Sequence, residues 1–195
     1  MYNQEGTLTL INCTIASNTT GDGGRGGGVI EASPLTTKSK STIIADNTAT
    51  GGGPDFHGRL TSYGCNLIED TTDCTIVGDE SGNIYGQDPL LGPLADNGGP
   101  TQTHALLFAS PAIDAVISCD CTTVGGDPVN QDQRGMKRPA DGDMDRAAYC
   151  DIGAYEKQPI SVGGIVERVD LVQPGVVTDE PAGGTTTNPA FPISN

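Results

Sequence analysis

Apolar and polar residues alternate along the first part of the chain, as in strands with one buried face. The alternation is clearest over residues 7–15, and a polar turn with the glycine-rich stretch 21–28 follows it. The same phrase returns after an offset of 29 residues, which carries Asn18 onto Asn47 and Ile15 onto Ile44. A third, degenerate copy occupies residues 64–68. The pattern predicts short strands that recur in register.

A repeat of this length, made of strands and turns without helical periodicity, is typical of a solenoid. We therefore expect an all-β chain that folds as a short parallel β-helix over residues 1–87. Ile15 and Ile44 should stack inward at equivalent positions of successive coils. Asn18 and Asn47 fall where the chain turns, either as stacked amides or as residues that tolerate a left-handed backbone. The exposed edge of the first coil predicts end-to-end stacking of copies, or further coils upstream in a longer parent chain.

The repeat stops near residue 88, where prolines become frequent and long ladder strands are excluded. We expect residues 88–156 to form a loop-rich C-terminal cap that closes one end of the coil stack. Arg134 and Arg138 are candidates for binding backbone carbonyls or for pairing with Asp132, Asp114 or Asp151. Residues 157–195 are rich in Thr, Pro and Gly, which predicts a flexible tail or linker.

Four motifs in the second half of the chain occur in a characteristic order. They are Gly-Pro-Leu-Ala-Asp-Asn-Gly-Gly-Pro at 92–100, Ser-Pro-Ala-Ile-Asp at 110–114, Asp-Gln-Arg-Gly at 132–135 and Cys-Asp-Ile-Gly-Ala-Tyr-Glu at 150–156. This series resembles the C-terminal end of the bacterial choice-of-anchor Q domain. The resemblance covers roughly the first four fifths of the chain. It implies a right-handed parallel β-helix on a secreted or cell-surface protein, and it implies no particular reaction.

The six cysteines have no spacing typical of a zinc site, which favours disulfides in an oxidising compartment. We expect Cys65 and Cys74 to close a short loop, and Cys13 to remain a buried free thiol. The resemblance implies that Cys150 pairs with Cys119 or Cys121.

Composition narrows the classes of partner. The formal net charge of −15 repels nucleic acids and anionic membranes, so no nucleic-acid partner is expected. No apolar run is long enough for a membrane-spanning segment, and residues 1–6 lack the regions of a signal peptide. Because disulfides indicate export, we expect the chain to be the C-terminal piece of a longer exported protein.

The best candidate for a metal site is the run Asp141-Gly-Asp143-Met-Asp145, in which alternating carboxylates can reach one hard cation. The run departs from the EF-hand loop because Arg146 stands at the position of the required glycine. The run is either a hydrated acidic turn or a calcium site, and a calcium ion bound here would have a structural role. His57 and His104 are far apart and have no ligand partner at a suitable spacing, which favours structural roles.

These observations predict a non-catalytic secreted or cell-surface module that serves as a stalk, an adhesin-like unit or a structural spacer. Its repetitive flank suits glycans or surface proteins as partners. The alternative is a calcium-dependent polysaccharide lyase or glycoside hydrolase acting in a groove along the β-helix. That alternative rests on fold analogy and has no assigned catalytic residues. The acids that could line such a groove, with Arg59 nearby, are Asp46, Asp55, Glu69 and Asp70.

Overall fold

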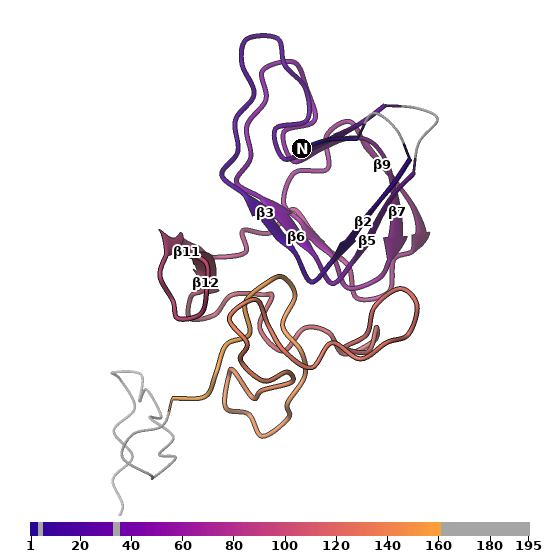
Figure 1. Ribbon diagram of the computed structural model, residues 1–195. Helices are drawn as coiled ribbons and strands as arrows, with labels where there is room; N and C mark the ends of the chain where they lie inside the picture. The colour runs from indigo at the N-terminus through magenta and orange to yellow at the C-terminus, as the bar shows by residue number, and fades with distance from the viewer. Residues whose placement is uncertain (4–5, 33–35, 161–195) are drawn as a thin grey trace, which may run out of the picture.

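The computed structural model describes residues 1–3, 6–32 and 36–160. Within these residues the chain is all-β: it forms twelve strands and no helix, as the sequence predicts (Figure 1). The predicted tail lies outside the described residues from 161 onward.

Ten of the strands take part in parallel pairs. In chain order they are β1 (Tyr2–Asn3), β2 (Thr7–Ile11), β3 (Thr14–Ala16), β4 (Val29–Glu31), β5 (Thr36–Lys40), β6 (Ile43–Ala45), β7 (Phe56–Tyr63), β8 (Leu67–Ile68), β9 (Cys74–Asp79) and β10 (Ile84–Tyr85). One sheet has the order β10-β8-β6-β3. In the other sheet the long strand β7 pairs with β4, β5 and β9, while β4 also pairs with β1 and β5 also pairs with β2. Figure 1 shows these strands curled around a common interior.

The register of the sheets places like residues on top of one another. Ile15 lies opposite Ile44, which lies opposite Ile68, and Tyr85 follows in the same row. Ile44 and Ile68 belong to one buried cluster with residues of the other sheet, such as Phe56, and Ile15 packs against that cluster. The predicted stacking of Ile15 on Ile44 toward a shared interior is therefore confirmed.

Residues 91–155 pack against the outer face of β6 and β8. They begin with the antiparallel hairpin of β11 (Leu91–Ala95) and β12 (Thr103–Leu106) and continue as irregular chain. Ile43 and Leu67, whose side chains point away from the interior, share a second buried cluster with Leu106, Val116 and Ile152. The run Ile-Ile-Ala of β6 is buried on both faces for this reason, and all three residues are fully buried. The structure thus corrects the expected position of the cap, which covers a flank of the strands.

Two disulfides attach this flanking region. Cys65, at the start of the chain segment leading into β8, bonds to Cys119, and Cys121 bonds to Cys150. The implied pairing of Cys150 is confirmed, with Cys121 as the partner. The expected Cys65–Cys74 loop is wrong, because Cys65 points outward into the flank cluster whereas Cys74 packs against the interior cluster.

Cys13 and Cys74 are the free thiols among the described residues. Cys13 agrees with the prediction of a free thiol, although it is only half-buried. Burial raises the pKa of both thiols, that of Cys74 to about 12. Both side chains are therefore held in the unreactive protonated form at neutral pH.

The loops 17–28 and 46–55 project together from the strands, at the top of Figure 1. They are joined by backbone hydrogen bonds, including Thr48 N to Asn18 O at 2.8 Å and Gly26 N to Gly52 O at 3.1 Å. The glycines permit this close approach: a Cβ atom on Gly27 would lie 2.5 Å from the carbonyl oxygen of Thr48. The glycine-rich stretches therefore form paired, stacked loops.

Asparagine side chains hydrogen-bond along the stack at two turns. The Nδ2 atom of Asn18 donates to Oδ1 of Asn47 at 2.9 Å, and that Oδ1 also accepts the backbone N–H of Asn18 at 3.0 Å. Asn66, which is fully buried, binds Asn83 in the same way at the other turn. Asn18 and Asn47 follow left-handed residues at positions 17 and 46 and are not left-handed themselves. The stacked-amide alternative is the one that the structure supports.

Candidate functional site

The carboxylate of Asp114 organises the loop that carries the predicted metal ligands. It accepts the backbone N–H groups of Gly142 at 2.9 Å, Asp143 at 3.1 Å and Tyr149 at 3.0 Å. Asp114 itself is held in place because its own N–H donates to Asp151 at 2.7 Å. A single buried carboxylate therefore draws residues 141–149 against the segment 110–114.

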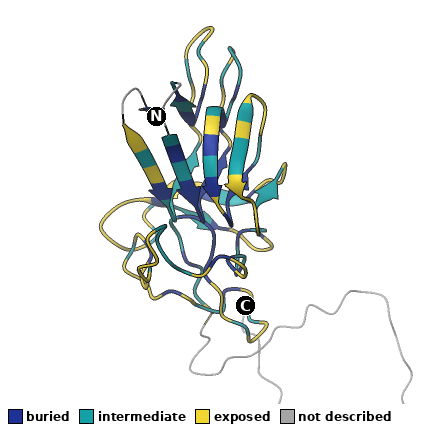
Figure 2. Ribbon diagram, turned by 90° about the vertical axis from the view of Figure 1, so that its right-hand side faces the viewer, coloured by how far each residue is buried: buried dark blue, intermediate teal, exposed yellow. Residues whose placement is uncertain are grey.

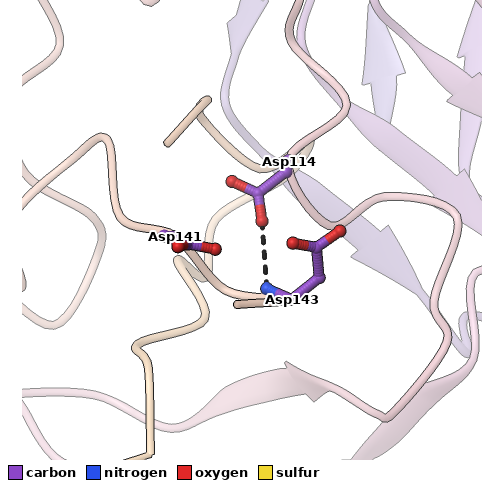
Figure 3. A group of neighbouring side chains, drawn as sticks. All are labelled: Asp114, Asp141 and Asp143. Atoms are coloured by element: carbon purple, nitrogen blue, oxygen red, sulfur yellow. Dashed lines mark hydrogen bonds between the residues drawn. The ribbon is translucent and has the colours of Figure 1, made fainter. Parts of the chain in front are cut away.

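This arrangement brings Asp114 together with two of the three predicted ligands, Asp141 and Asp143 (Figure 3). One carboxylate oxygen from each lies within 4.8 Å of the others. Asp114 is buried, Asp141 is half-buried and Asp143 is exposed, so the group opens to solvent on one side. This geometry suits a hard divalent cation with water completing its coordination.

The third predicted ligand, Asp145, lies outside this group of carboxylates. Its side chain is turned to the backbone, where Oδ1 accepts the N–H of Ala147 at 2.7 Å. Alternation along the sequence suggested that all three carboxylates face one ion. The loop instead forms successive aspartate turns, in which each carboxylate binds a nearby N–H group, and the turn at Asp145 keeps its carboxylate out of the group.

Two observations on the acidic group bear on cation binding. The Oδ1 atom of Asp141 is shielded from solvent and has no hydrogen-bond partner among the described residues, while Oδ2 accepts the N–H of Arg146 at 2.9 Å. Burial raises the pKa of Asp114, and the nearby Asp143 carboxylate adds to the rise, although three N–H donors oppose it. A cation would supply the missing partner of Asp141 and offset the repulsion between Asp114 and Asp143.

The two predicted arginines hold the irregular chain together. Arg134 pairs with Asp132 at 2.7 Å and donates to the carbonyl oxygen of Glu156 at 2.6 Å, and its guanidinium lies 3.6 Å from the ring centre of Tyr155. Burial alone would raise the pKa of Asp132, yet N–H donors, led by that of Glu156, and the Arg134 guanidinium hold it below its ordinary value. Carbonyl binding and the Asp132 pair are as predicted.

Among the described residues, Arg138 is the largest fully buried side chain. It donates to the carbonyl oxygens of Asp151 at 2.9 Å and Gly153 at 2.6 Å, and it pairs with Glu156 at 3.3 Å. Sequence reasoning did not single out Glu156, whose side chain binds the N–H groups of Ala140 and Asp151. Burial raises the pKa of Asp151 to about 7 and that of Glu156 to about 8; the Asp114 carboxylate adds to the rise at Asp151, and the Asp151 carboxylate adds to the rise at Glu156. This buried network ties together the irregular chain of the flanking region.

The four acids proposed for an enzymatic groove lie around one open pocket: Asp46, Asp55, Glu69 and Asp70. Arg59 is not among the lining residues. Asp55 is buried, which raises its pKa, and Glu69 contributes to the rise. Both its oxygens are nevertheless engaged: Oδ1 binds Asn47, and Oδ2 accepts the N–H of Asp70 at 2.8 Å. Glu69 likewise accepts the N–H of Asp46 at 2.8 Å.

These contacts show that Asp55 and Glu69 stabilise the turns between strands by accepting backbone N–H groups. His104 has a structural contact as well, since its Nδ1 lies 2.8 Å from the carbonyl oxygen of Gly92. His57 is half-buried on β7, and its Nδ1 has no partner among the described residues.

Asp114 is the residue of the acidic group that sequence reasoning missed. It ends the motif Ser-Pro-Ala-Ile-Asp, far from residues 141–145 along the chain, and no periodicity connects the two segments.

Within the part of the chain that the structure describes, no helix has the length and apolar character needed to cross a membrane. Comparison with known proteins finds no matching family model, no matching curated protein and no matching solved structure.

Proposed function

We propose that the chain belongs to a secreted or cell-surface right-handed parallel β-helix, and that it acts as a non-catalytic stalk or adhesin-like module. The observation that carries the proposal is the uninterrupted parallel register from β3 through β6 and β8 to β10, with like residues stacked over one interior. Stacked coils of this kind form a rigid rod with repetitive flanks, which suits display and multivalent contact.

The family resemblance supports this proposal through the contacts of its motifs. Asp114, Asp132, Arg134 and Asp151 come from three of the four motifs, and each binds the backbone of the flanking region. The two disulfides indicate an oxidising, extracellular environment, which agrees with display at the cell surface.

Calcium is the proposed structural ion of the flanking region, bound by Asp114, Asp141 and Asp143. The buried, unpartnered Oδ1 of Asp141 and the three converging carboxylates support this assignment. The ion would tie the loop 141–149 to the segment 110–114 and would take no part in a reaction.

Thermal unfolding with added calcium and with EDTA tests the ion. Binding to the native state alone should raise the melting temperature, and EDTA should lower it. Asp141→Asn should remove the response to calcium, whereas Asp127→Asn, an exposed aspartate elsewhere in the flanking region, should keep it. An identical melting temperature with calcium and with EDTA would exclude the site.

A polysaccharide-cleaving enzyme is the second candidate function, and the pocket that gathers Asp46, Asp55, Glu69 and Asp70 favours it. The engagement of the Asp55 and Glu69 carboxylates by backbone N–H groups favours the non-catalytic module. Incubation with a panel of polysaccharides, with and without calcium, separates the two. The module should leave chain length unchanged. Reproducible cleavage that Asp46→Ala or Asp55→Ala abolishes would overturn the non-catalytic proposal.

A further inference from the structure

The parallel strands β2, β5, β7 and β9 lie side by side and share one outer face, and Figure 2 views these strands from outside. Parallel register arranges the outward residues in rows that run across the strands. One row is Thr7, Thr36, Arg59 and Thr75, and the next is Thr9, Lys38, Thr61 and Val77. We call these two rows the threonine face. All eight residues are exposed or half-exposed.

The threonine face differs in charge from the chain as a whole. It carries Lys38 and Arg59 and no acidic residue, on a chain with a formal net charge of −15. The ion pairs found among the described residues are Arg134 with Asp132 and Arg138 with Glu156, so neither cation of the face is paired there. At physiological ionic strength charges more than about 8 Å away are largely screened. A ligand at this face therefore meets two local cations.

Neighbouring groups extend the face on one side. The Nζ atom of Lys38 lies 5.9 Å from the ring centre of Tyr63, whose side chain is partly exposed in the adjoining row. That row also holds Lys40, but Lys40 donates to Thr122 at 2.7 Å and lies near Asp79, whose pKa it helps to lower. Lys40 is therefore engaged, which leaves Lys38 and Arg59 as the cations of this surface without an ion-pair partner among the described residues.

Spacing within the face suits an extended chain of sugars. Adjacent strands lie about 4.8 Å apart, and successive outward residues of one strand lie about 6.7 Å apart. Threonine hydroxyls at these intervals can each donate and accept a hydrogen bond, as sugar hydroxyls require. Lys38 and Arg59 occupy diagonal positions on β5 and β7, so they can meet acidic groups on successive sugar residues. The Tyr63 ring offers an apolar surface for one sugar face.

We propose that the threonine face binds an anionic polysaccharide of the polyuronate class, with carboxylates at Lys38 and Arg59 and hydroxyls along the threonine rows. The inference rests on the proposed function, because it names the partner of the same surface module. The positive charges of Lys38 and Arg59 favour an anionic ligand over a neutral one. A polyuronate carries one charge per sugar, a lower charge density than nucleic acid, so the acidic remainder of the protein repels it less.

Binding of polygalacturonate and alginate to the native protein, measured by affinity electrophoresis in 0.15 M salt, tests the proposal, with dextran as the neutral probe. The double variant Lys38→Gln/Arg59→Gln should bind both polyuronates about tenfold more weakly, since each exposed ion pair contributes modestly. The matched control Arg25→Gln/Lys137→Gln removes the same charge from exposed positions off the face and should remain within about twofold of the native protein. Unchanged melting temperatures establish that both variants fold.

Several outcomes would overturn the proposal. They are the absence of polyuronate binding, equal retention by dextran, and equal losses in the two double variants. A regular array of threonines is also suited to binding ice. Thermal hysteresis of the native protein that persists in Lys38→Gln/Arg59→Gln would identify ice, and not a polysaccharide, as the ligand of the threonine face. Cleavage of a probe polysaccharide would contradict the proposed non-catalytic function but not binding at the threonine face. Failure of the proposed function and failure of this inference are therefore distinguishable.

Discussion

Asn66 provides the sharpest test of the stacked architecture, because its side chain joins three successive levels of the chain. It is fully buried. Its Oδ1 accepts the Ser39 hydroxyl at 2.6 Å and the Thr42 N–H at 3.2 Å. Its Nδ2 donates to the Ser39 carbonyl at 3.2 Å, the Ser62 hydroxyl at 3.0 Å and Oδ1 of Asn83 at 3.2 Å.

Asn66→Ala removes all of these contacts at once. A buried donor or acceptor left without a partner costs about 1–3 kcal/mol. The Thr42 N–H loses its side-chain acceptor, and the carbonyl oxygen of Ser39 loses a donor. The hydroxyls of Ser39 and Ser62 can reorient toward each other and recover part of the loss. We therefore expect the free energy of unfolding to fall by about 3 kcal/mol, a large share of the stability of a domain of this size.

Urea unfolding followed by circular dichroism measures this loss under oxidising conditions. Asn18→Ala is the matched control, because Asn18 makes the same kind of bond to Asn47 at an exposed turn. Water can replace the partners there, so the control should lose about 1 kcal/mol or less. Equal losses in the two variants, or a loss under about 1 kcal/mol for Asn66→Ala, would refute the reasoning that buried amides hold successive levels together.

Three further predictions address the flanking region and the loops. Burial raises the pKa of Glu156 from 4.5 to about 8, so its stabilising proton is fully present below about pH 4 and is lost as the pH rises through 8. The free energy of unfolding should fall between about pH 5 and pH 9, and Glu156→Gln should flatten this fall; native stability that rises over the same range would contradict the pKa shift. Cys121→Ser/Cys150→Ser opens a loop with a sequence separation of 29 and should cost about 3–4 kcal/mol in urea unfolding, whereas a cost near zero would show that the flank packs without it. Gly51→Ala places a Cβ against the Gly23 carbonyl oxygen and should cost about 1–3 kcal/mol, with faster hydrogen exchange in both projecting loops; unchanged exchange would exclude tight stacking of the loops.

Residues near one another in the repeat were predictable, and residues that meet across the irregular chain were not. The stacking of Ile15 on Ile44 follows from strand alternation and from the equal length of successive repeats. The roles of Arg134 and Arg138 followed from residue type, because a buried guanidinium needs several acceptors. Glu156 gave no comparable signal, since a lone glutamate beside a tyrosine is common on protein surfaces.

Sequence by itself determined that the described chain is all-β and that its strands recur in one register, because both depend on local alternation and on a constant repeat length. Tertiary structure decided that residues 91–155 cover a flank, that Cys65 bonds to Cys119, and that Asp114 joins Asp141 and Asp143. Those contacts join segments without any common period. Their partners are selected by which outward face is apolar and by which backbone N–H groups need an acceptor, and both become defined only when the strands have stacked.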